Sequence, residues 1–111
     1  MSLLSDKVME AALDRISKTD ELSAELHMKA ERAKFKAEAV YDAFFLRLDP
    51  SKSVANRQAE ARISPEYAEA MDDYFAALQA HESLKNERTR KFAVIECWRS
   101  WSSARTKGLI T

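Results

Sequence analysis

The fold is decided by residues 22–48, LSAELHMKAERAKFKAEAVYDAFFLRL, where small and apolar side chains recur at alternating steps of four and three. These positions are Leu26, Ala30, Ala33, Ala37, Val40 and Phe44. Such spacing is typical of a helix that packs along a coiled-coil seam. The alanines let a partner helix approach closely, because interaxial distance depends on the side chains at the contact.

A second long helix is predicted from residue 64 to about residue 106. Ser64 supplies an N-cap, Pro65 fits the first helical position, and Glu66 places an acid in the first turn. The seam of this helix is expected to contain Tyr67, Met71, Tyr74 and Leu78. No helix breaker follows until Gly108, which is expected to close the helix.

The connection between the two long helices is expected at residues 49–63. Asp49-Pro50 ends the first helix, since a residue before proline is pushed out of the helical conformation. Ser53 is expected to cap a short turn of helix within the connection.

A short N-terminal helix is predicted over about residues 5–18, followed by a break and a long helix over about residues 20–48. Thr19-Asp20-Glu21 has the composition of a new helix start, and the apolar line through Ile16 does not continue in step into Leu22 and Leu26. One continuous but kinked helix is the alternative.

The composition predicts a single all-α domain. One Gly and two Pro in 111 residues leave few turn formers, and 46% of the residues are hydrophobic. We therefore expect a long antiparallel, coiled-coil-like helical hairpin with the short N-terminal helix. Two or three helices cover few of the aromatic side chains, so a homo-oligomer is expected.

The end of the chain is strongly basic. Residues 85–107 contain seven Lys and Arg against Glu87 and Glu96, a net charge of +5, and residues 1–84 carry the balancing −5. Cations attract polyanions, and aromatic rings can stack on bases. The candidate residues for binding a nucleic acid or a protein partner are Lys85, Arg88, Arg90, Lys91, Trp98, Arg99, Trp101, Arg105 and Lys107. Both tryptophans are alternatively core residues of a helical bundle.

Other chemistry has little support in the sequence. His27 and His81 lack the preceding glutamates of a di-iron site, and Cys97 has no histidine near it in its helix. There is no Gly-rich phosphate loop. We expect no enzyme, metal or cofactor. A single cysteine, no signal-peptide pattern and no membrane-spanning stretch lead us to expect a cytoplasmic protein.

Part of the chain, about residues 55–105, resembles a group of small helical phage and prophage proteins. The resemblance is carried by AEARISPEY at 59–67, LKNER at 84–88, IECWRS at 95–100 and SAR at 103–105. These proteins have an alanine- and arginine-rich connection, a proline-tyrosine helix start and a late Glu-x-Trp-Arg-Ser/Thr element. They are often encoded near single-strand annealing or single-strand-binding proteins. Some are similar in layout to phage recombination mediators, which are helical and oligomeric.

Together these observations lead to a functional hypothesis. We expect a non-enzymatic accessory protein of phage recombination or replication that binds single-stranded DNA, a recombinase or a single-strand-binding protein in the host cytoplasm. The alternative is a coiled-coil adaptor, or an inhibitor of a host protein, that binds no nucleic acid. An export substrate of the helical-hairpin kind would need a Trp-x-Gly turn, which residues 49–64 lack.

Overall fold

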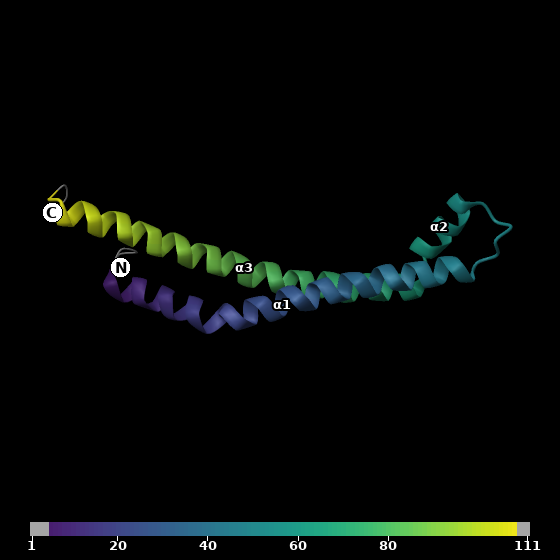
Figure 1. Ribbon diagram of the computed structural model, residues 1–111, viewed down its shortest axis with the longest axis horizontal. Helices are drawn as coiled ribbons and strands as arrows, with labels where there is room; N and C mark the ends of the chain where they lie inside the picture. Colours follow the sequence, from purple (N-terminus) through teal and green to yellow (C-terminus); the bar gives the residue numbers. More distant parts are fainter. Residues whose placement is uncertain (1–4, 109–111) are drawn as a thin grey trace. The chain divides into compact units, whose positions relative to one another are not determined.

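The computed structural model describes residues 5–108 and confirms the all-α prediction. It contains α1 (Asp6–Arg47), α2 (Val54–Arg62) and α3 (Pro65–Thr106), and no strand among the residues described (Figure 1). Two of the helices are long, at 42 residues each, and the third has nine. The short helix is therefore the connection α2, and no separate short helix lies at the N-terminus.

The predicted break at Thr19-Asp20 is wrong, because α1 is continuous through it. The line of covered residues passes from Ile16 to Leu26 through Thr19 and Ser23, in steps of three, four and three. Both intermediate residues are polar, so the apolar pattern is interrupted while the helix is not. The Thr19 hydroxyl, 1% exposed as a residue, donates to the Arg15 carbonyl at 2.7 Å and is thereby satisfied inside the seam.

The chain divides into two compact units, which are described separately. Unit 2 spans Glu25–His81 and contains the second half of α1, all of α2 and the start of α3. Within it α1 and α3 run antiparallel, as the ring contacts His27–His81 (5.2 Å between centroids) and Tyr41–Tyr67 (5.5 Å) require. Its buried apolar residues are all alanines: Ala30, Ala37, Ala61, Ala70 and Ala77.

In unit 2 the residues predicted for the seam are each half-buried or buried: Leu26, Ala33, Ala37, Val40, Phe44, Tyr67, Met71, Tyr74 and Leu78. On α3 the most deeply buried positions are nevertheless Ala70 and Ala77, beside Met71 and Leu78. The closest approach of the two helices is therefore lined by methyl groups, with the larger side chains to one side of it.

Two serine caps define the connection, as the sequence predicts. The Ser53 Oγ accepts from the Asn56 amide at 3.1 Å, and the Ser64 Oγ accepts from the Tyr67 amide at 3.3 Å. Ser64 is buried and its hydroxyl also donates to the Ala61 carbonyl at 2.8 Å, so it joins the end of α2 to the start of α3. Arg57 lies over the Phe45 ring, 4.7 Å from its centroid, and holds α2 against α1.

Unit 1 consists, in its described part, of residues 5–24 and 82–108. The start of α1 and the end of α3 pack antiparallel and bury Ala12, Thr19, Leu84 and Ile95. The end of α3 is closed as predicted: Gly108 has a φ of 72°, and its amide donates to the Arg105 carbonyl at 3.0 Å.

Candidate nucleic-acid interface

The basic residues predicted as a binding surface lie on α3 in unit 1. Residues 82–107 carry seven cations and three carboxylates, whereas the α1 side of the unit, residues 6–24, carries three cations and five carboxylates. Residues 6–24 therefore neutralise only part of the positive charge of residues 82–107, and together the two segments keep a net charge of +2. Where each α3 cation points decides which of them can meet a ligand.

Arg88 points inward and is not part of the exposed surface. Its side chain is 13% exposed and lies in the seam. Its Nη1 donates at 2.8 Å to the Ile16 carbonyl and at 2.8 Å to the Thr19 hydroxyl, and its Nη2 donates at 3.1 Å to Asp20 Oδ1. A guanidinium with three acceptors of its own has little left for a phosphate. We therefore assign Arg88 to the packing of unit 1.

Trp98 is also engaged within the unit. Its indole Nε1 donates to Asp6 Oδ1 at 2.9 Å, and its ring is half-buried between the α1 start and α3. Trp98 therefore anchors the first turn of α1, and only part of its ring is in contact with solvent.

Glu87 pairs with Arg15 across the unit through two bonds, Nε to Oε1 at 2.6 Å and Nη2 to Oε2 at 3.1 Å. The hydrogen bond from Arg15 lowers the pKa of Glu87, and the nearby charges of Lys91 and Arg90 lower it further. The same bond raises the pKa of Arg15. This carboxylate is therefore charged at neutral pH and bound to Arg15, and it also lies near Lys91 and Arg90.

An exposed row remains along α3. Lys85, Phe92 and Arg99 follow at intervals of seven, which places them on one side of the helix, and Ser103 and Lys107 continue the row at intervals of four. The Phe92 ring is 49% exposed. Arg99 donates to Glu96 at 2.9 Å in a pair that is about two-thirds exposed on both sides and hence weak. We call these five residues the α3 row.

A shallow depression of about 430 Å³ lies at the end of this row, lined by Arg99, Ser100, Ser103, Ala104 and Lys107. Two hydroxyls between two cations form a set of hydrogen-bond donors suited to an oxyanion. The sequence analysis did not select Ser100 and Ser103. Their spacing of one and four residues from Arg99 is the signal that could have indicated them.

The other predicted cations lie around the row. Arg90 and Arg105 are exposed, and Lys91 is half-buried in the seam. Among residues 5–108, Lys85, Arg90, Lys91, Arg105 and Lys107 form no ion pair with a carboxylate. The guanidinium of Arg105 lies 5.2 Å from the Trp101 ring centroid, so this half-buried tryptophan carries a cation on its face.

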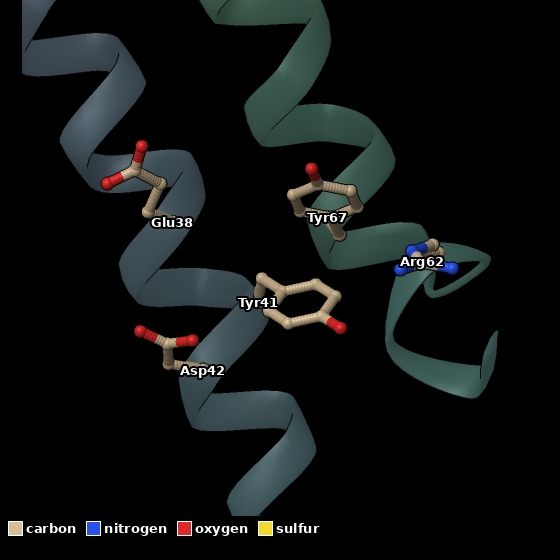
Figure 2. Close-up of a pocket in the computed structure, with 5 residues that line it drawn as sticks. All are labelled: Glu38, Tyr41, Asp42, Arg62 and Tyr67. Carbon is tan, nitrogen blue, oxygen red and sulfur yellow. The ribbon is translucent and has the colours of Figure 1, made fainter. Parts of the chain in front are cut away.

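Unit 2 contains a polar pocket of a different kind. Figure 2 shows Glu38, Tyr41 and Asp42 from α1, Arg62 from α2 and Tyr67 from α3 around an open space of about 440 Å³. The two tyrosine rings meet edge to face, while the Glu38 and Asp42 carboxylates lie on the far side of α1 from Arg62. The arrangement provides a tyrosine contact between α1 and α3, and the acidic and basic groups do not converge on one point.

Two further findings bear on the chemistry. Within the described range, no three His, Cys, Asp or Glu side chains come close enough to hold a metal ion. None of the described helices has an apolar stretch long enough to cross a membrane.

Comparison of the chain with protein-family models, with curated proteins and with solved structures returned no match.

Proposed function

We propose that this chain is a non-enzymatic accessory protein that binds single-stranded DNA along the α3 row of unit 1. The observation that carries the proposal is the α3 row itself, where Lys85 and Lys107 have no ion-pair partner among residues 5–108 and the ring of Phe92 is exposed. Unneutralised cations favour a polyanion, and an exposed ring favours one whose bases are not paired. The resemblance to phage proteins supports a role in recombination or replication.

Each member of the surface has a distinct role in this proposal. Lys85, Arg90 and Lys107 contact phosphates, and Phe92 provides a stacking surface. Arg99 exchanges its exposed glutamate for a phosphate oxygen, which costs little because that pair is screened by water. Ser100 and Ser103 donate to the same phosphate. Arg88 and Trp98, in contrast, keep α1 packed on α3.

Fluorescence anisotropy with a labelled oligothymidine, read over a salt series, tests this proposal. Each phosphate contact contributes about −0.7 to the slope of log K against log salt. The Lys85→Ala/Lys107→Ala variant should weaken binding and flatten this slope by about one unit or more. Phe92→Ala should weaken binding by ~1–3 kcal/mol at an unchanged slope, because stacking releases no counterions.

The matched control is Lys29→Ala/Lys34→Ala, which removes two exposed cations from unit 2 at the same cost in net charge. If the control and Lys85→Ala/Lys107→Ala weaken binding equally, the charge of the whole chain is responsible and the α3 row is not the site. An absence of binding at 50 mM salt by a folded protein refutes DNA binding and favours the protein adaptor instead.

We also propose that the chain self-associates. Leu13, Leu22, Phe35, Leu46 and Phe75 are all more than two-fifths exposed in the single chain, and exposed apolar area of this extent is usually covered by a partner. Light scattering at micromolar concentration tests this, and a mass equal to the 12.7 kDa chain would refute it.

A further inference from the structure

The surface of α1 in unit 2 carries a second stripe, separate from the seam. It consists of Met28, Arg32, Phe35, Ala39, Asp42 and Leu46, at steps of four, three, four, three and four. All six are exposed, and the large apolar members are 52% (Met28), 66% (Phe35) and 77% (Leu46) exposed. We call these six residues the outer stripe. Alternating steps of this kind are what one helix presents to another in a coiled coil.

The outer stripe can pair with a second copy of itself that runs in the opposite direction. The steps are the same read from either end, so a second copy laid antiparallel about an axis near Ala37 meets the stripe position by position. Met28 then faces Leu46 of the second copy, an apolar pair. Arg32 faces Asp42, an ion pair, and Phe35 faces Ala39, a large side chain against a small one. Each of these contacts occurs twice across the axis.

A parallel arrangement lacks this complementarity. Every residue would then face its own copy, so that Arg32 would meet Arg32 and Asp42 would meet Asp42. Like charges in a desolvated contact are unfavourable. Neither Arg32 nor Asp42 forms an ion pair within residues 5–108, so both are available to a second chain.

We propose that the outer stripe is the interface of an antiparallel homodimer of this chain. The inference rests on the self-association proposed above and adds its face and direction; it does not depend on DNA binding. Beside the stripe, Lys36 and Glu38 would each approach their own copy near the axis. Lys36 lies in a groove with Glu66, Glu69 and Asp73, and Glu38 lines a groove with Lys34, so each has an opposite charge of its own chain nearby.

Charge reversal tests the pairing of Arg32 with Asp42. By sedimentation equilibrium, Arg32→Asp alone and Asp42→Arg alone should each raise the dimer dissociation constant about tenfold, because each change acts twice across the axis. The double variant Arg32→Asp/Asp42→Arg should restore wild-type dimerisation. Lys34→Glu, an exposed reversal on the same helix outside the stripe, is the control and should have little effect. A double variant as weak as the single ones would overturn the proposal.

Cross-linking tests the direction of the two helices. In a Cys97→Ser background, a mixture of Met28→Cys and Leu46→Cys chains should form disulfide-linked heterodimers, whereas Met28→Cys alone should not link to itself. Self-linking of Met28→Cys would show a parallel pair and overturn the proposal.

Phe35→Glu completes the set, because it changes an exposed residue and should leave the helical circular dichroism intact. It should give a monomer that still binds oligothymidine. A dimer that persists in Phe35→Glu refutes the outer stripe but leaves self-association standing, and a wild-type monomer at 100 µM refutes both.

Discussion

Replacing Thr19 by valine should destabilise unit 1 more than the loss of a single neutral hydroxyl normally does. The hydroxyl of Thr19 accepts from the Arg88 guanidinium at 2.8 Å, inside a seam where the arginine side chain is only 13% exposed. Valine keeps the shape but removes the acceptor, so a charged N–H group is left with one partner fewer. Leaving a buried charged donor unsatisfied costs ~1–3 kcal/mol. The contact of Arg88 with Asp20 compensates little, because that carboxylate is largely exposed to water.

Substituting Arg88 as well shows whether the cost of Thr19→Val comes from the unsatisfied guanidinium. Arg88→Met removes the charge together with its desolvation, and exchanging a buried ionic group for an apolar one of similar volume is often close to neutral. In the double variant Thr19→Val/Arg88→Met the valine no longer leaves a charge unsatisfied. We therefore expect the double variant to be more stable than Thr19→Val alone, with a coupling energy of ~1–3 kcal/mol.

Urea unfolding followed by circular dichroism measures these differences, at one fixed protein concentration because self-association makes stability depend on concentration. Thr89→Val is the matched control: its hydroxyl donates to the carbonyl four residues before it, as that of Thr19 does, but it is exposed and accepts nothing from an arginine. If Thr19→Val costs no more than Thr89→Val, or if the two substitutions of the cycle are additive within ~0.5 kcal/mol, the reasoning is wrong.

Three further outcomes are expected. Ser64→Ala should lower stability by ~1 kcal/mol and Ser53→Ala by less, because Ser64 is buried and caps the longer helix; equal urea midpoints would contradict this. The lowered pKa of Glu87 makes its pair with Arg15 fully stabilising above the ordinary carboxyl pKa of about 4.3, and this contribution is lost as the pH falls through the lowered pKa. The difference in thermal midpoint between wild type and Glu87→Gln should therefore shrink below pH 4.3, and a constant difference would exclude the pair as its cause. Trp98→Phe should loosen the first turn of α1, seen as faster amide hydrogen exchange at residues 9–12, while Trp101→Phe should leave that exchange unchanged.

The sequence allows the helices and their ends to be predicted because those features depend on local chemistry. Ser53, Ser64 and Gly108 each cap one end of a helix through bonds or backbone angles within one helical turn. The alanines of residues 30–37 recur at steps of three and four, which place them on one face of a helix. The continuity of α1 could not be predicted in this way. Thr19 and Ser23 occupy seam positions although both are polar. A search for apolar spacing misses such positions, because it does not recognise that the Thr19 hydroxyl can be buried when it donates to a carbonyl of its own helix.

The same limit applies to the candidate binding surface. Arg88 and Lys85 are both cations in one basic segment, and only the facing helix distinguishes them: Arg88 lies opposite a carbonyl and a hydroxyl of α1, while Lys85 lies in solvent. A count of charges therefore gives the sign of the surface correctly and assigns some of its members wrongly. Phe92 lies in the same basic segment, and its exposure likewise depends on which side of α3 faces α1.

The contact between Arg88 and Thr19 also affects which alignments of the two helices are possible. Seam positions recur every seven residues, so a helix pair that slides by seven residues would again place seam positions opposite one another. Such a slide in unit 1 would bring Arg88 opposite Ala12 in place of Thr19, burying a guanidinium without its hydroxyl acceptor. A single polar residue at a seam position is known to fix the register of coiled coils in this way. Within unit 1, the alignment of α1 on α3 is thus determined less by the strength of the packing than by the one layer that cannot be repeated elsewhere.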